Sequence, residues 1–294
     1  MLLVPLTVAA QDDPPAIADT TWQAFAPGVI SLPDIRETSP SIAADGQTMV
    51  FARTPNWRDK VPYIATRSGD AWTVAEAPFA DTLYNVALAP DGQSAFFKTY
   101  EMQDGEEVSR AYRVERTEDG WGTPHALPSL TGINAGYFCP MADGTLYFFA
   151  RTPRPGIYVA APDGNGGYGA PQWLSDAVSP EGTTSFDVLM HPDEDRLIIT
   201  RAGIPDDRAD DLGPRGFYLY RRTADGWQEA KRLDLPYGWG ATVLPDGRLL
   251  FVDAGDLQAV PLAALGVFIL GLAWFAFNAG STTAGTTDIA LIAL

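Results

Sequence analysis

The stretch NVALAPDGQSAFFKT, residues 85–99, decides the fold, because the chain carries the same pattern five times. The other four copies are SPSIAADGQTMVFAR (39–53), YFCPMADGTLYFFAR (137–151), FDVLMHPDEDRLIIT (186–200) and GATVLPDGRLLFVDA (240–254). Their anchoring aspartates are Asp45, Asp91, Asp143, Asp193 and Asp246, with spacings of 46, 52, 50 and 53 residues. A strand-rich repeat of about 50 residues is typical of β-propeller blades.

Each copy predicts four strands. A short strand leads into a Pro-Asp-Gly type of turn, in which Gly and Asp tolerate the backbone of a tight hairpin. A strongly apolar strand follows, then an alternating one, and then a turn and an aromatic residue that opens the fourth strand. The exception to the turn pattern is Glu194, which stands where the other copies have glycine.

The fifth copy ends after its third strand, near Val260. Residues 21–32, TWQAFAPGVISL, resemble the fourth strands of the other copies, with Trp22 in the place of Trp72, Trp121 and Trp227. An N-terminal strand that completes the last blade would close the ring and remove an exposed sheet edge. The sequence therefore predicts one all-β, five-bladed propeller of four-stranded blades over residues 20–262.

These repeats resemble the WD-like propeller repeats of the TolB type, with their proline-rich first strand, Pro-Asp-Gly turn, "D-I-Y" strand and Asp-Gly-Trp turn. The resemblance covers about residues 20–262 and implies the fold. It implies little about activity, because the family includes binding modules, envelope proteins and accessory domains of peptidases. No G-x-S-x-G occurs in the chain, so an attached peptidase domain is not expected.

The two ends of the chain differ from the repeats. Residues 2–10, LLVPLTVAA, form a short apolar run before Gln11, which is typical of an export signal although no basic residue precedes it. Residues 257–287 carry no charge, and Val260 to Ala279 is long and apolar enough for a transmembrane helix. We expect a signal peptide over 1–10 and one C-terminal membrane helix.

The C-terminal segment, about residues 261–294, resembles one membrane helix of the ammonium transporter family. Its AWFAFNAGS, residues 273–281, matches the family's GWFGFNAGS motif apart from Ala273 and Ala276, which replace glycines. The resemblance implies that Trp274 and Phe277 occupy family positions near the pore. It covers one of about eleven helices, and one helix cannot enclose a polar path through lipid. A true fusion, a frameshift and a join of two sequences all remain open explanations.

Composition excludes several classes of protein. The chain has 37 acidic and 20 basic residues, a net charge of −17, which argues against binding to nucleic acid. One cysteine, Cys139, allows no internal disulfide, and two histidines, His125 and His191, make a multi-histidine metal site improbable. We expect no metal and no cofactor. The aspartates of the loop 204–216 could ligate calcium, but a solvated loop is the commoner arrangement.

Three arginines are the candidate binding residues. Arg53, Arg151 and Arg201 each stand eight residues after the aspartate of their blade, which places them at the same end of the apolar strands. Guanidinium groups on one face could hold a small anionic ligand with a carboxylate or phosphate group. The alternative is that these arginines form ion pairs with acidic loops. Such loops are numerous in a chain with 37 acidic residues.

Three functions follow from these patterns. The first is a non-enzymatic, extracytoplasmic binding or scaffold propeller, located in the periplasm or outside the cell, whose partner is a protein or a small anionic ligand and whose C-terminal helix could anchor it in a membrane. The second is a membrane protein of ammonium transport, which rests on the C-terminal segment alone. The third is a glycosidase, since some five-bladed propellers use paired carboxylates in the central funnel. No catalytic constellation is visible in the sequence.

Overall fold

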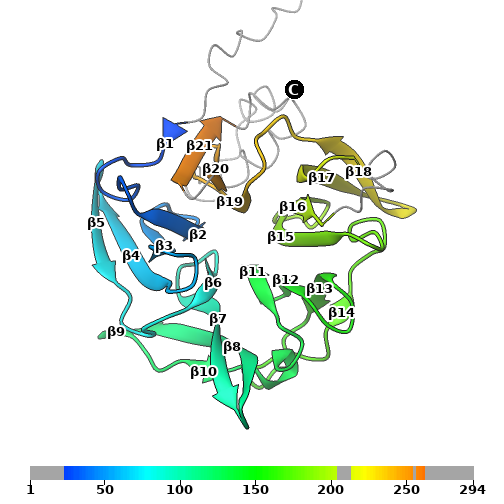
Figure 1. Cartoon of the computed structure of the whole chain (residues 1–294), viewed down its shortest axis with the longest axis horizontal. Coiled ribbons are helices and arrows are strands. Elements are labelled where there is room, and N and C mark those ends of the chain that lie inside the picture. The colour runs from blue at the N-terminus through cyan, green and yellow to red at the C-terminus, as the bar shows by residue number, and fades with distance from the viewer. Residues whose placement is uncertain (1–22, 204–212, 254–255, 262–294) are drawn as a thin grey trace, which may run out of the picture.

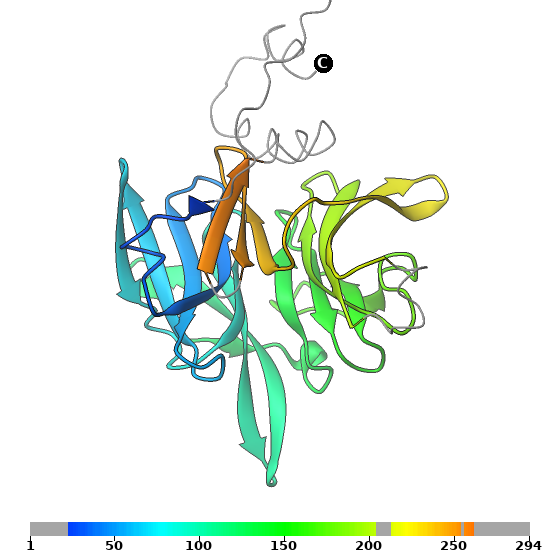
Figure 2. The ribbon, with the colours of Figure 1, turned by 45° about the horizontal axis from the view of Figure 1, so that its top comes forward.

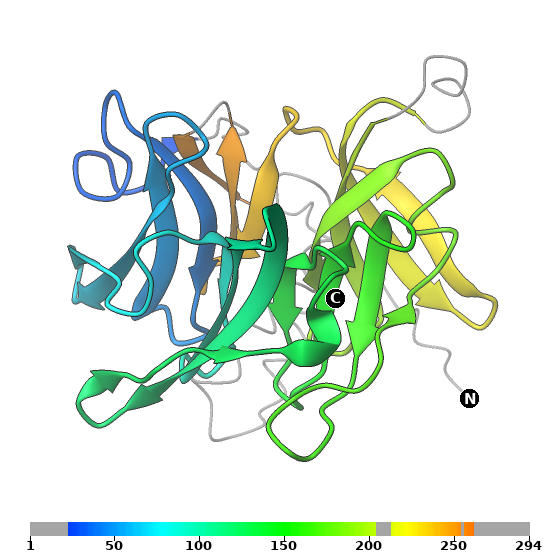
Figure 3. The same cartoon turned by 60° about the horizontal axis from the view of Figure 1, so that its bottom comes forward.

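Five antiparallel sheets stand like blades around one axis (Figure 1). The structure is a computed structural model that describes residues 23–203, 213–253 and 256–261. The five inner strands contact one another in a closed ring (Figure 1; Figure 3 shows the ring from a steeper angle). They are β2 (Arg36–Ile42), β6 (Tyr84–Leu88), β11 (Gly136–Pro140), β15 (Thr184–Met190) and β19 (Trp239–Val243). The predicted all-β, five-bladed propeller is confirmed.

The first two blades follow the predicted strand order, with additions in the second. Blade 1 consists of β2, β3 (Thr48–Thr54), β4 (Val61–Ser68) and β5 (Ala71–Glu76). Blade 2 consists of β6, β7 (Ser94–Gln103), β8 (Glu106–Thr117) and β10 (His125–Ala126). The short strand β9 (Gly120–Trp121) also pairs with β8, and the 3-10 turn η1 (Pro128–Leu130) follows β10. The long β7–β8 hairpin projects well beyond the ring (Figure 2).

The other three blades repeat the same order. Blade 3 consists of β11, β12 (Leu146–Ala150), β13 (Gly156–Ala160) and β14 (Gln172–Trp173). Blade 4 consists of β15, β16 (Arg196–Ala202), β17 (Gly216–Thr223) and β18 (Gly226–Arg232). Blade 5 consists of β19, β20 (Arg248–Asp253), β21 (Asp256–Pro261) and the N-terminal β1 (Gln23–Ala24).

The N-terminal segment closes the ring as predicted. Gln23 and Ala24 pair with Ala259 and Gln258 of β21, and the Phe25 amide donates to the Leu257 carbonyl at 2.9 Å. Phe25 and Ile30, 7 % and 0 % exposed, pack in the core between blades 5 and 1. This pairing covers the outer edge of blade 5, which would otherwise present free backbone groups. Trp22 lies just outside the described residues.

The apolar second strands form the core because their side chains alternate between the two neighbouring blades. In β7, Phe97 packs toward blade 1 and Phe96 packs toward blade 3. The same alternation in the other blades yields five buried clusters, one at each blade junction. The continuous apolar runs are therefore buried on both faces, as expected for strands between blades.

The anchoring aspartates form the turn between the first and second strand of each blade. Asp45 Oδ1 accepts the Gln47 amide at 2.8 Å, and the turns of blades 2, 3 and 5 repeat this bond. Gly46 follows with φ +70°, and Glu194 holds the equivalent position in blade 4 with φ +54°. We call the end of the propeller that carries these turns the turn face, and the opposite end the loop face.

One part of the predicted fold is corrected. No helix among the described residues is long and apolar enough to cross a membrane. The predicted C-terminal transmembrane helix is therefore no part of the observed fold, which is all-β. Residues 262–294, including Trp274 and Phe277, lie outside the described residues, as do the signal-peptide segment 1–10 and the aspartates of residues 204–212.

Candidate functional site

A cavity of about 620 Å³ lies within the ring of inner strands and opens toward the turn face. All five inner strands line it, from their midpoints to the turns that follow them. Most of the wall is apolar, including Ile42, Val86, Leu88, Met141 and Leu189. Cavities that hold small molecules have this size, a mainly apolar wall and a few polar groups that fix orientation.

The polar groups of this cavity sit on five equivalent β-bulges. Each inner strand shifts register against its neighbour in mid-strand, and the bulged residue has a positive φ between 51° and 65°. The five residues are Ser39, Asn85, Tyr137, Asp187 and Gly240, and all of them line the cavity. A positive φ is uncommon for residues other than glycine, and four such residues lie together here. Bulges often change the direction of side chains beside functional sites.

Asp187 is the most unusual member of this bulge ring. Its Oδ2 accepts the Ala241 amide at 3.1 Å and lies 3.4 Å from the Thr200 hydroxyl. The side chain therefore joins blade 4 to the inner strand of blade 5. Burial raises the pKa of the Asp187 carboxyl to about 6, against the three hydrogen bonds from Ala241, Gly240 and Thr200 that lower it.

Tyr137 and Cys139 come from the inner strand of blade 3. The Tyr137 hydroxyl hydrogen-bonds the side chain of Asn85, and burial raises its pKa far above the ordinary value. The Cys139 Sγ accepts the Met190 amide at 3.4 Å, and burial raises the pKa of the thiol to about 11. A thiol with this pKa carries little thiolate at neutral pH, so Cys139 is unreactive there.

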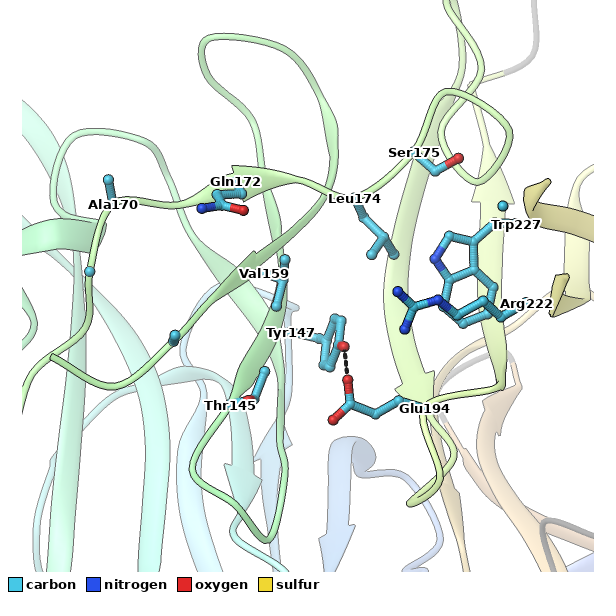
Figure 4. A pocket seen from close by; sticks show the side chains of 13 residues that line it. Thr145, Tyr147, Val159, Ala170, Gln172, Leu174, Ser175, Glu194, Arg222 and Trp227 are labelled. Carbon is cyan, nitrogen blue, oxygen red and sulfur yellow. Dashed lines mark hydrogen bonds between the residues drawn. The ribbon is translucent and has the colours of Figure 1, made fainter. Parts of the chain in front are cut away.

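A second cavity, of about 680 Å³, lies on the outside between blades 3 and 4 (Figure 4). Glu194 crosses this junction and accepts a hydrogen bond from the Tyr147 hydroxyl of blade 3. Arg222 and Trp227 face them from blade 4 (Figure 4). Glu194 lines both this groove and the central cavity. The residue that breaks the glycine pattern of the turns is thus the one that links the two cavities.

Two of the three predicted arginines have partners within the propeller. The Arg53 guanidinium donates to the carbonyls of Val29 and Ile30 at 2.7 and 3.1 Å and lies 3.7 Å from the Glu37 carboxylate. It therefore ties the chain that follows β1 to blade 1. Arg53 thus has the ion-pair role that the sequence analysis gave as the alternative to anion binding.

Arg201 is likewise held inside its own blade. It is 3 % exposed, contacts the Tyr220 hydroxyl, pairs with Glu229 at 2.7 Å and lies 3.9 Å above the Tyr218 ring. Arg151 differs, because it is exposed and has an ordinary backbone bond from its amide to the Ile133 carbonyl. None of the three belongs to the lining of the central cavity. Their predicted role in holding an anion stays a prediction.

The two histidines lie in different surroundings. His191 is fully buried, its Nδ1 accepts the Asp193 amide at 3.1 Å, and His125 lies exposed on β10. Within the described ranges, His191, Asp193 and Asp195 are the one group with metal-ligating atoms close together. The Arg196 guanidinium lies 3.3 Å from His191 Nε2, and this positive charge disfavours a bound cation.

Comparison with known proteins gives likenesses of fold. No family model matches the chain, and no curated protein sequence matches it. Among solved structures, a protein described as TolB from Agrobacterium tumefaciens is 14 % identical, with a TM-score of 0.48 over 75 % of this chain and 69 % of that one.

Two further solved structures show how varied such likenesses are. A hypothetical protein from Leishmania major is 12 % identical, with a TM-score of 0.45 over 81 % of this chain and 87 % of that one. A periplasmic gluconolactonase from Pseudomonas aeruginosa is 13 % identical, with a TM-score of 0.41 over 75 % of this chain and 79 % of that one. TolB-like β-propellers are thus among the structural neighbours of this chain, and these comparisons give no evidence for an ammonium transporter segment.

Proposed function

We propose that this protein is a non-enzymatic binding propeller whose central cavity holds a small, mainly apolar molecule. The observation that carries the proposal is the cavity itself: an apolar wall from all five blades, with Ser39, Asn85, Tyr137 and Asp187 gathered on the bulges. Apolar walls supply most of the affinity for a small molecule, and a few fixed polar groups supply orientation. The ligand would enter at the turn face and present a hydrogen-bonding end to the bulge ring.

A glycosidase is the second candidate, because three carboxylic acids, Asp143, Asp187 and Glu194, line the same cavity. Asp187 has a raised pKa, as an acid catalyst would, and Glu194 lies at the turn that follows it. Both groups are already engaged in contacts between blades, Asp187 with the Ala241 amide and Glu194 with the Tyr147 hydroxyl. These contacts favour a structural role for the two acids, and therefore favour binding over hydrolysis.

We further propose an extracytoplasmic location, on the basis of the apolar run at residues 2–10 and the small residues before Gln11. The test is to express the full chain and sequence the N-terminus of the protein in each cell fraction. A mature chain that begins at Gln11 in the exported fraction supports the proposal. A chain that keeps Met1 and stays in the cytoplasm contradicts it.

The binding proposal is tested with N-phenyl-1-naphthylamine, a small apolar probe whose fluorescence rises in a dry site. Thr242 lines the cavity and is partly exposed, so Thr242→Trp should fill part of the space and weaken probe binding at least tenfold. The matched control is Thr73→Trp, which adds the same bulk at an exposed position of β5. Equal probe binding by both variants and the unmodified chain would place the site elsewhere.

A further inference from the structure

A second cluster of side chains lies at the loop face, where the inner strands β6 and β11 begin and β7 and β12 end. Tyr84, the first residue of β6, pairs with Lys98 of β7. Asn134 lies just before β11, and Arg151 directly follows β12. Lys60 lies just before β4 of blade 1, and its carbonyl accepts the Leu83 amide at 3.1 Å. Three blades therefore contribute to one spot.

Lys98 is the centre of this cluster. It is 6 % exposed, its Nζ donates to Asn134 Oδ1 at 2.8 Å, and the same nitrogen lies 5.1 Å from the centre of the Tyr100 ring. Burial, together with the nearby charges of Arg151 and Lys60, lowers the pKa of the Lys98 ammonium to about 8. A buried ammonium with two cations beside it is an arrangement that costs free energy.

Lys60 approaches the cluster from the other side. Its Nζ lies 5.1 Å from the centre of the Tyr84 ring, and that ring meets the Tyr100 ring edge-on at 4.9 Å between centroids. The Tyr84 hydroxyl donates to the Arg58 carbonyl at 2.6 Å, which fixes the ring. Burial lowers the pKa of Lys60 as well. Two tyrosine rings therefore hold the two lysines at one place.

These three cations differ from Arg53 and Arg201, the other two arginines at the ends of second strands. In the described part of the chain, no salt bridge joins Lys60, Lys98 or Arg151 to a carboxylate, whereas Arg53 and Arg201 each have an acidic partner. The remaining charges facing the cluster are those of Arg58, Asp59 and Glu107, which act on the two tyrosines. The chain has three lysines in all, so two of its three lysines gather here.

We propose that Lys60, Lys98 and Arg151 form a binding site for a small oxyanion group, such as a phosphate or a carboxylate. An anion at this spot would neutralise the mutual repulsion of the three cations and supply the acceptor that the side chains of Arg151 and Lys60 lack among the described residues. Tyr100, 36 % exposed, would contact the rest of the molecule. The site lies at the opposite end of the inner strands from the mouth of the central cavity, and the proposal does not depend on the binding function proposed above.

The chain offers its own reference for the experiment, because Lys231 lies exposed on the outer strand β18. Trace acetylation of the folded full-length protein, read by mass spectrometry, reports the rate at each of the three lysines. Inorganic phosphate or citrate should slow acetylation of Lys98 and Lys60 in a saturable way and leave Lys231 unchanged. Whichever anion protects at the lower concentration identifies the phosphate or carboxylate character of the ligand.

Arg151→Gln should raise the half-protecting anion concentration about five- to tenfold, the usual consequence of losing one charge-assisted contact. The matched control is Arg67→Gln on the exposed end of β4, which should change nothing. Equal protection of all three lysines, or no protection of Lys98 before Lys231 is protected, would overturn the site. So would an Arg151→Gln variant that is protected at the same anion concentration as the unmodified chain.

Discussion

The two ends of the inner strands are built from different parts of the repeat. At the turn face, every blade supplies the same elements, a bulge, an apolar half-strand and a turn, and the result is an apolar cavity. At the loop face, the connections differ from blade to blade, and one junction gathers Lys60, Lys98 and Arg151. Repetition therefore builds a cavity with a common wall, while the unrepeated loops concentrate charge at one place in a chain of net charge −17.

The largest expected effect at the cavity is that of Asp187→Asn. The raised pKa, about 6 against an ordinary 3.8, means that the folded state binds its proton more tightly than the unfolded state does. The stability that protonated Asp187 contributes is therefore fully present below pH 4 and is lost as the pH rises through 6. Asn keeps an acceptor for the Ala241 amide and tolerates the φ of +60°. We expect it to gain about 1–3 kcal/mol at pH 8.

Urea unfolding of both proteins between pH 4 and 8 measures this effect. The unmodified chain should lose stability across that window, and the Asn variant should show a flatter profile. The gain should vanish near pH 4, where the carboxyl of the unmodified chain is protonated in the folded state. A variant that is less stable at every pH would show that the carboxylate itself is required between blades 4 and 5.

The next largest effect distinguishes Arg201, which has an acidic partner, from Arg151, which has none among the described residues, at the loop face. Arg201→Met should cost about 2 kcal/mol in the free energy of unfolding, because it removes the contacts with Glu229 and Tyr220 and the stacking on Tyr218. Arg151→Met should change stability by less than about 0.5 kcal/mol, as exposed substitutions usually do. Urea titration at pH 7 compares the two. Losses of equal size would remove the distinction between paired and free arginines.

The smallest effect concerns Glu194 at the turn face. Glu194→Ala loses the hydrogen bond from the Tyr147 hydroxyl but keeps a side chain at φ +54°. Glu194→Gly loses the same bond but relieves the backbone, so it should be about 1 kcal/mol more stable than the Ala variant. In both variants the pKa of Tyr147 should fall, because the hydrogen bond to Glu194 that raises it is lost. Burial of the Tyr147 hydroxyl still keeps this pKa above its ordinary value. Thermal unfolding and spectroscopic titration of tyrosine measure the two quantities. An Ala variant as stable as the Gly variant would argue that the turn is unstrained.

The fold was predictable because its signal is repeated. Turn residues such as Asp45 and Gly46 recur at one period, and the two-sided burial of the second strands leaves continuous apolar runs. Ring closure was predictable because the fifth repeat ends one strand early, which leaves a place for an N-terminal strand. In the structure, Phe25 and Ile30 pack at that place. The C-terminal membrane helix was predicted from apolar length and from a resemblance over one short segment, and it is no part of the observed fold.

The candidate sites were predictable only in part. The equal spacing of Arg53, Arg151 and Arg201 placed them correctly at the ends of second strands, but spacing does not show which arginine has a partner. The bulge ring was not predicted, because Ser39, Asn85, Tyr137, Asp187 and Gly240 share a conformation and no chemistry. The missing glycine at Glu194 was visible in the sequence, and Glu194 lines both cavities. Lys60 and Lys98 come together through long-range pairing, which leaves no local pattern.

The proposed binding function requires a ligand in the central cavity, and the single cysteine reports on that cavity directly. Cys139 lines it, and the pKa of about 11 makes its alkylation by N-ethylmaleimide slow at pH 7 and faster as pH rises toward 11. The measurement is the alkylation rate of Cys139 at pH 8.5, with and without saturating N-phenyl-1-naphthylamine. We predict a decrease of at least tenfold with the probe, and loss of probe binding once Cys139 is alkylated. An unchanged rate while the probe is bound would contradict the account.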